Sequence, residues 1–123
     1  MNNVHQTAII SPRAQLGQNV TIGANTIIYD NVSIGDNTTV GAFCELGVQN
    51  HLSNGEMLQI GANSHIRSHS VFYEGSIFAE GLTTGHRVTI REKVVAGKNL
   101  QIGTLSYLQG HCEIGDYVRF HSN

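Results

Sequence analysis

The stretch LGQNVTIGANTIIYDNVSIGDNTTVGAFCEL, residues 16–46, repeats a simple pattern every six residues. Each hexad carries an aliphatic residue at the same place, and the series reaches back to the start of the chain. Its members are Val4, Ile10, Leu16, Ile22, Ile28, Ile34, Val40 and Leu46. Random placement would give eight such positions in a row with odds on the order of 1 in 10⁵, so the period is a genuine feature of the chain.

A second series with the same period begins at Ile60. Its positions are Ile60, Ile66, Phe72, Phe78, Thr84, Ile90, Ala96, Ile102, Leu108, Ile114 and Phe120. All are large and apolar except Thr84 and Ala96. A period of six matches neither an α-helix nor an alternating strand, and its extent predicts a single domain, residues 1–123, built from internal repeats.

The residues between the apolar positions predict one strand and one turn in each hexad. Ten of the fourteen glycines directly follow an apolar position, and asparagine recurs two residues later. Asparagine and glycine tolerate the left-handed backbone conformation best, so a tight turn is expected there. Small or β-branched residues come next and suit an inward-facing strand. Three hexads close a triangular coil of about 18 residues, and about six coils of parallel strands fit the chain.

Two places interrupt this pattern. The step from Leu46 to Ile60 is two residues longer than two hexads, so we interpret residues 47–59 (GVQNHLSNGEMLQ) as a loop extruded from one corner. A small bulge in an irregular coil is the alternative. The final segment DYVRFHSN stops just after a turn, without the polar cap that repeat proteins need. We therefore expect the C-terminal end of the β-helix to be missing.

The hexads resemble the [LIV]-G-x-x-[STAV]-x pattern of the left-handed β-helix acyltransferases over nearly the whole chain. The stretch from Glu45 to Ser76 is similar to the equivalent region of UDP-N-acetylglucosamine acyltransferases, in which a loop follows the early coils and can reach the neighbouring subunit's cleft. The resemblance implies an all-β, left-handed parallel β-helix. It also implies a homotrimer of prisms packed side by side, with the acyl donor bound in the groove between neighbours.

Composition narrows the class of partner. Charged residues make up 13 % of the chain, against about 25 % in typical proteins, which suggests that other subunits cover part of the surface. The formal net charge is −2 and no basic run is dense, which argues against nucleic acid. Without a long apolar stretch or a signal peptide, we expect no membrane insertion and a cytoplasmic location. Cys44 and Cys112 lack the spacing of a disulfide framework or metal site, so we expect them simply to pack.

Residues 18 apart should stack on one corner of the prism. One such corner collects five basic or imidazole side chains: Arg67, His69, His86, Arg87 and His121. Cations stacked about 5 Å apart repel each other, so a phosphate-bearing donor or acceptor would be favoured there. We predict that Arg67, His69, Arg87 and His121 bind substrate. The alternative is a set of solvated corner residues without function.

His86 is the first candidate for a general base. In TTGHRVTIRE it follows a glycine, two residues after an interior position, similar to the I-A-H and I-G-H segments that carry the base in lipid A-type acyltransferases. His111, in LQGHCEIGD, is the second candidate and lies one residue off that register. The resemblance implies that the histidine accepts a proton from the attacking amine or hydroxyl, a task that suits imidazole near neutral pH. Gly103 is a candidate backbone donor to the thioester carbonyl.

Three functions compete at this point. The first is acyl transfer from acetyl-CoA, or from another CoA or carrier-protein thioester, to a nucleotide-linked amino sugar; the resemblance points to lipopolysaccharide or other surface-polysaccharide synthesis, with N-acetyl transfer favoured. The second is a γ-type carbonic anhydrase, which shares this fold but needs three histidines around zinc, two of them five residues apart, a spacing the repeats lack. The third is a scaffold or binding module. No resident cofactor and no metal are expected.

Overall fold

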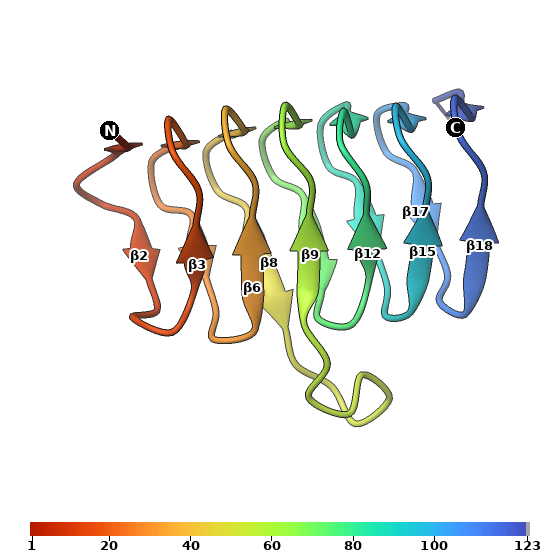
Figure 1. The fold of residues 1–123 in the computed structure, drawn as a ribbon, viewed down its shortest axis with the longest axis horizontal. Coiled ribbons are helices and arrows are strands. Elements are labelled where there is room, and N and C mark those ends of the chain that lie inside the picture. Colours follow the sequence, from red (N-terminus) through yellow and green to blue (C-terminus); the bar gives the residue numbers. More distant parts are fainter. Residues whose placement is uncertain (123) are drawn as a thin grey trace.

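Nineteen short strands wind into one triangular prism in the computed structural model, which describes residues 1–122 (Figure 1). Successive strands belong in turn to three parallel sheets, here called the first, second and third faces. The first face contains β1 (Asn3–Val4), β4 (Thr21–Ile22), β7 (Thr39–Val40), β10 (His65–Ile66), β13 (Thr83–Thr84), β16 (Gln101–Ile102) and β19 (Arg119–Phe120). The second face contains β2 (Ile9–Ile10), β5 (Ile27–Ile28), β8 (Glu45–Val48), β11 (Val71–Tyr73), β14 (Thr89–Ile90) and β17 (Tyr107–Leu108). The third face contains β3 (Gln15–Leu16), β6 (Val32–Ile34), β9 (Leu58–Ile60), β12 (Ile77–Phe78), β15 (Val94–Ala96) and β18 (Cys112–Ile114).

The strand register confirms the 18-residue coil. Thr83 pairs with Gln101 and Gln101 with Arg119, each exactly one coil farther along the chain. The first face has seven strands and the other two have six each, so the chain makes six full coils and begins a seventh, close to the expected six. Every pairing is parallel, and the architecture is consistent with the predicted left-handed β-helix. The two termini lie at opposite ends of the prism (Figure 1).

The interior holds the side chains that the six-residue period predicts. From Ile22 to Ile102 every position of the two series is at most 5 % exposed. In the middle coils the second inward position of the hexad is also buried, for example Val20, Thr26 and Leu100. Phe72, Phe78, Val88 and Val94 all lie in this core, so they supply no apolar surface to the outside of the prism.

Glycine and asparagine have different structural roles in the hexad. A Cβ added to Gly61 would lie 2.5 Å from the backbone of Ala79 and Glu80, so glycine is required there by the stacking of the next coil. The left-handed conformation occurs two residues later, as at Asn63 with φ of 59°. Asn31 stands three residues after the interior position Ile28, as Asn63 does after Ile60, but its φ is not positive.

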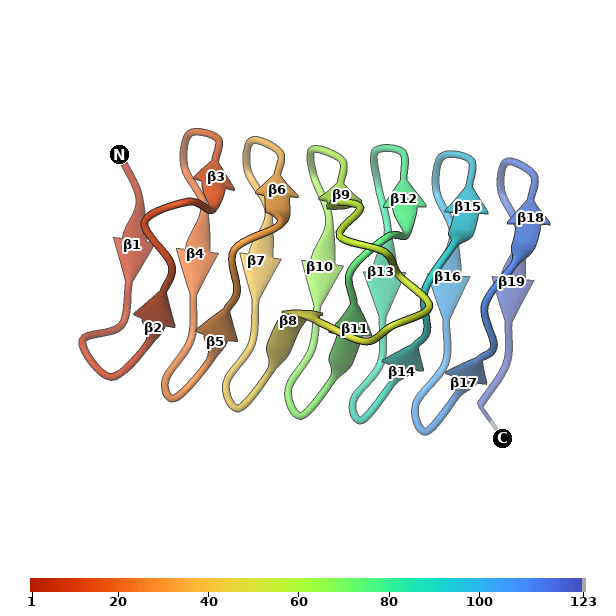
Figure 2. The same cartoon turned by 90° about the horizontal axis from the view of Figure 1, so that it is seen from below.

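The extruded loop is shorter than predicted and folds back on its own prism. β8 continues to Val48 and β9 begins at Leu58, which leaves residues 49–57 outside the strands. Figure 2 shows this loop leaning over the later coils on the second corner, between the second and third faces. Hydrogen bonds hold it there: Asn50 donates to Glu92, and Ser53 donates to Glu74.

Candidate functional site on the first corner

The corner between the first and second faces, here called the first corner, gathers all but one of the predicted site residues. Those on it are Arg67, His69, His86, Arg87, Gly103 and His121. They follow strands β10, β13, β16 and β19, which are neighbours in the first sheet. His111 lies elsewhere, on the second corner between β17 and β18. The two candidate bases therefore belong to different surfaces.

Negative charge is excluded from the first face and first corner. The segments that form them in the described chain are 3–8, 21–26, 39–44, 65–70, 83–88, 101–106 and 119–122. These segments contain Arg67, Arg87 and Arg119 and not one acidic residue. All nine acidic residues lie elsewhere, at Asp30, Asp36, Glu45, Glu56, Glu74, Glu80, Glu92, Glu113 and Asp116. An anionic ligand would meet attraction and no carboxylate repulsion on this surface.

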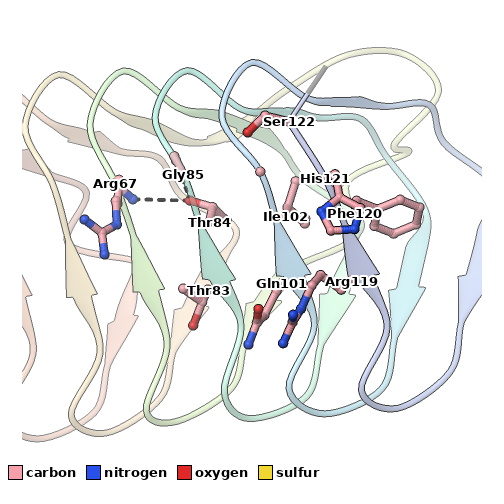
Figure 3. Close-up of a pocket in the computed structure, with 11 residues that line it drawn as sticks. Arg67, Thr83, Thr84, Gly85, Gln101, Ile102, Arg119, Phe120, His121 and Ser122 are labelled. Atoms are coloured by element: carbon pink, nitrogen blue, oxygen red, sulfur yellow. Dashed lines mark hydrogen bonds between the residues drawn. The ribbon is translucent and has the colours of Figure 1, made fainter.

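Two open depressions lie on this surface and share Arg67. The first, of about 280 Å³, is lined by Thr39, His65, Arg67, Ser68 and His86 among others. The second, of about 300 Å³, includes Arg67, Thr83, Gln101, Gly103, Arg119 and His121. In Figure 3, Thr83, Gln101 and Arg119 form one row across neighbouring strands. Ligand pockets usually measure about 300–1,000 Å³, so each depression can hold only part of a molecule as large as CoA.

His86 is held by a hydrogen-bond network within the first corner. The Oγ of Ser68, one coil earlier, lies 2.8 Å from Nδ1 of His86 and 3.0 Å from Nδ1 of His69. The His69 ring in turn stacks on Phe43, with ring centroids 5.2 Å apart and planes inclined by 15°. The backbone N–H of His86 donates to Thr104 Oγ1 at 3.2 Å. Both the ring and the backbone of His86 are therefore fixed, and within residues 1–122 its Nε2 is the ring nitrogen left to meet a ligand.

Thr84 breaks the aliphatic series at the base of this corner, and its hydroxyl has a structural role there. The backbone N–H of Arg67 donates to Thr84 Oγ1 at 3.2 Å, and that hydroxyl donates to the carbonyl of Gly85 at 3.0 Å (Figure 3). Elsewhere on this face the equivalent N–H donates to a strand carbonyl, as Gly41 does to Ile66. β10 and β13 accordingly pair only at His65 and Thr83. The regular ladder is thus interrupted between the two strands that precede Arg67 and His86.

The first corner also accepts unfavourable backbone conformations. Phe43, His69, Arg87 and Leu105 occupy its successive turns, all with φ between 57° and 66°. On the third corner, between the third and first faces, most equivalent residues are asparagine or glycine, for example Asn63. Bulky side chains at positive φ are outliers, and such strain is concentrated at functional sites in proteins. Such residues are most numerous on this corner, with four against three on the other two corners together, so the backbone agrees with the placement of the depressions.

Gly103 lines the second depression, but its N–H is not free. It donates to the carbonyl of Phe120 at 2.8 Å as part of the ladder between coils. A Cβ at Gly103 would lie 2.3 Å from the backbone nitrogen of Ser122. The predicted donation from this N–H to a thioester would require that ladder bond to break. Close packing of coils explains why glycine stands here.

Sequence reasoning overlooked several residues of this site. Ser68 stands 18 residues before His86, at the same place in its hexad, so the coil length pointed to their contact. His65, Thr39 and Arg119 precede interior positions and therefore face outward on the first face. The alternation of inward and outward side chains along each strand could have identified these three residues.

His111 lies beside the loop in a smaller depression of about 230 Å³ on the second corner. Leu52, Arg91, Glu92 and Tyr107 are among its other lining residues. Arg91 donates to Glu92 at 3.2 Å and to the Tyr107 hydroxyl at 3.1 Å, so its charge is already engaged. This depression therefore offers less free positive charge to an anionic ligand than the first corner does.

Other candidate centres are not assembled within the described residues. In residues 1–122, no three His, Cys, Asp or Glu side chains gather as the ligands of a metal ion would. Cys44 is buried, and that burial raises the pKa of its thiol, which fits a packing role. The same part of the chain contains no helix of the length and apolar character needed to cross a membrane.

Residues 13–47 match the family model for the bacterial transferase hexapeptide (six repeats). Among curated proteins, none matches the chain. The predicted resemblance to hexapeptide acyltransferases is thus confirmed directly for a segment of the repeat, and the solved structures extend it at the level of fold.

Three solved structures illustrate the similarity of fold. PerB from Caulobacter crescentus, in complex with CoA and GDP-perosamine, is 22 % identical, with 93 % of this chain and 54 % of PerB covered and a TM-score of 0.50. AntD, an N-acyltransferase from Bacillus cereus in complex with dTDP and 3-hydroxybutyryl-CoA, is 15 % identical, with 98 % and 78 % covered and a TM-score of 0.58. The acetyltransferase domain of PglB from Neisseria gonorrhoeae FA1090 is 20 % identical, with 100 % and 55 % covered and a TM-score of 0.61. The chain spans about half the length of PerB and of the PglB domain. It therefore has the hexapeptide β-helix fold that these acyltransferases share.

Proposed function

We propose that this chain is the repeat domain of a cytoplasmic acyltransferase that moves an acetyl or acyl group from a CoA thioester to an amino sugar attached to a nucleotide. The observation that carries the proposal is the placement of His86. It lines a depression on an acid-free, cationic corner, with Nδ1 bonded to Ser68 and Nε2 available to a substrate. Similarity of fold to PerB and AntD, whose structures contain CoA or an acyl-CoA together with a nucleotide or nucleotide sugar, supports the substrate class.

The proposed reaction is direct acyl transfer. The amine nitrogen of the sugar attacks the carbonyl carbon of the thioester, a C–N bond forms, and the C–S bond breaks. The proton lost by the amine passes to Nε2 of His86 and then to the departing thiolate, so the products are an amide and a free thiol. Similarity of fold to AntD, an N-acyltransferase, favours an amine over a hydroxyl as the acceptor.

The cationic residues would hold the anionic parts of both substrates. Arg67 lines both depressions, so it can contact donor and acceptor at once. Arg87, His69 and His121 are exposed on the same corner and would bind phosphate oxygens, a role for which the planar guanidinium is well suited. Gly103 would contribute by leaving the floor of the second depression without a side chain, which lets the thioester approach the backbone closely.

A homotrimer would complete the site. Each depression alone is too small for CoA, and both are open, so a second surface must cover the substrates. Exposed Phe43 and Leu105 flank the cationic residues on the same corner and could contact the neighbouring subunit. The depression that holds His86 would then be closed by a face or loop of the next prism. Light scattering tests this assembly: a mass of about 40 kDa, three times 13.3 kDa, supports the trimer, and a monomer at micromolar concentration contradicts it.

A binding and turnover screen tests the proposed function. The chain would be titrated with acetyl-CoA, with an acyl-carrier thioester and with UDP-, GDP- and dTDP-linked amino sugars, and thiol release would then be followed. We expect micromolar binding of a thioester and a nucleotide sugar, and Arg67→Ala should weaken both. Loss of turnover in His111→Ala, with normal turnover in His86→Ala, would move the site to the second corner. Absence of binding and turnover would favour a scaffold.

A further inference from the structure

We propose that Ser68 is a positioning residue that holds His86 and His69 in opposite tautomers, so that the free Nε2 is a proton acceptor on His86 and a proton donor on His69. The catalytic meaning of this arrangement rests on the proposed function. The proton arrangement itself rests only on the geometry of three side chains on the first corner.

The geometry restricts where the protons can be. Ser68 Oγ lies 2.8 Å from Nδ1 of His86 and 3.0 Å from Nδ1 of His69. A hydroxyl has one hydrogen, so it can donate to only one of the two rings. The other ring must then donate its own Nδ1–H to the hydroxyl oxygen. All three groups are satisfied when the bonds run in one direction, from one imidazole through the hydroxyl to the other.

The surroundings of the two rings determine in which direction these hydrogen bonds run. His86 and Ser68 line the depression on the first face, whereas His69 is not among its lining residues. His69 instead stacks on Phe43, away from the position at which an acceptor amine would be activated. A general base at His86 needs an unprotonated Nε2, which places the hydrogen on Nδ1. His86 therefore donates to Ser68, Ser68 donates to Nδ1 of His69, and His69 carries its own hydrogen on Nε2.

This arrangement gives the two histidines complementary chemistry from one hydroxyl. The unprotonated Nε2 of His86 can accept the proton of the attacking amine. The Nε2–H of His69 can donate to a phosphate oxygen, which fits its exposed position next to Arg87 in the neighbouring coil. A hydroxyl takes the place that a carboxylate would otherwise fill, in agreement with the absence of any acidic residue from the described first corner. The corner thus fixes a base without adding a negative charge that would repel phosphates.

Nitrogen NMR of histidine-labelled protein tests the proton arrangement directly. At about pH 9, above the usual range of histidine titration, protonated and unprotonated ring nitrogens give well-separated signals. We expect His86 with hydrogen on Nδ1 and His69 with hydrogen on Nε2. In Ser68→Ala, His86 should move toward the Nε2–H form that free histidine favours. Ser68→Thr should restore the original tautomer, because Thr104 already occupies the equivalent position two coils later.

Outcomes of this experiment separate the inference from the function. Hydrogen on Nε2 of His86 in the unmodified chain, or no change of tautomer in Ser68→Ala, would overturn the inference whether or not a substrate is known. Once a substrate of the enzyme is known, Ser68→Ala should lower kcat about tenfold and leave KM unchanged. This loss corresponds to the free energy of about one hydrogen bond. Ser68→Thr should restore kcat. Ser33→Ala on the third face is the matched control and should change neither signal nor rate. If both histidines have the expected tautomers but no acyl transfer occurs, the inference stands and only the proposed function is contradicted.

Discussion

The side-chain amide of Asn50 donates a hydrogen bond to Glu92, 2.9 Å away across 42 positions of sequence. Ser53 donates to Glu74 in the same way at 2.6 Å, and the two glutamates are only 3 % and 2 % exposed. Residues 49–57 are therefore tied to their own second corner by two buried carboxylates. Burial acts to raise the pKa of Glu92, but the hydrogen bond from Asn50 and the charge of Arg91 outweigh it, so that pKa lies below its usual value.

Acid should release this loop. A carboxyl group whose pKa is lower in the folded than in the unfolded chain stabilises the folded form. Its full contribution is present when the pH is above the unfolded pKa of about 4.3, and it is lost as the pH falls through the folded pKa. We expect the protection of amides 49–57 against hydrogen exchange to fall below about pH 4, before the coils unfold. Glu92→Gln should make the loop's protection less dependent on pH, because only the Glu74 carboxylate then holds it. Protection that persists until global unfolding would show that Glu92 does not hold the loop.

Coil stacking makes one glycine indispensable and leaves another replaceable. Gly61→Ala should destabilise the chain by about 1–3 kcal/mol, because its Cβ would lie 2.5 Å from the backbone of the next coil. Gly115→Ala is the matched control, since no described atom lies within 4 Å of a Cβ there and its φ is not positive. Urea melts of the two variants decide the matter. Equal midpoints would contradict the stacking argument.

Substitution in the strained turns of the first corner should raise the stability of the folded chain. Leu105 is 58 % exposed with φ of 66°, so Leu105→Asn should stabilise the chain by about 1 kcal/mol through relief of backbone strain. The reverse change on the third corner, Asn63→Leu, should cost a similar amount. Thermal melting at a concentration where assembly is unchanged measures both. A lower melting temperature for Leu105→Asn in the monomeric state would mean that the leucine is not strained.

Thr84 should matter for stability as well as for the site. Thr84→Val keeps the shape but leaves the N–H of Arg67 and one lone pair of Gly85 without this partner, so we expect a loss of about 1–3 kcal/mol. Thr89→Val, on the outward side of β14, is the control and should change stability little. Denaturant unfolding measures the difference. If Thr84→Val were as stable as the unmodified chain, the hydroxyl would not be needed at the broken ladder.

The sequence predicted the prism well because its signal is periodic. Interior positions from Ile22 to Ile102 follow from the six-residue step, and the corner that joins Arg67, His86 and His121 follows from the 18-residue coil. The direction of the loop did not follow, because it depends on Asn50 and Glu92, which are far apart in sequence and belong to no repeat.

Side-chain chemistry at the site was harder to predict than position. The hydroxyl of Ser68 stood in the predicted column, but its bond to two imidazoles depends on ring orientations that spacing does not give. Gly103 was predicted as a backbone donor to the thioester carbonyl, and its N–H donates instead to the carbonyl of Phe120 in the ladder. Thr84 was visible only as a departure from the aliphatic rule, and the reason lies in the break between β10 and β13.

The most direct test of the proposed acyltransferase is the turnover of His86→Ala beside the unmodified chain. Both would be incubated with acetyl-CoA and the nucleotide-linked amino sugar that binds best, and free thiol would be measured over time. His5→Ala, on the first coil, controls for the loss of an exposed histidine. We predict that His86→Ala melts normally, still binds acetyl-CoA and loses at least about 10²-fold in acyl transfer, as expected for loss of a general base. Unchanged turnover in a folded His86→Ala variant would remove this histidine from the mechanism and contradict the account.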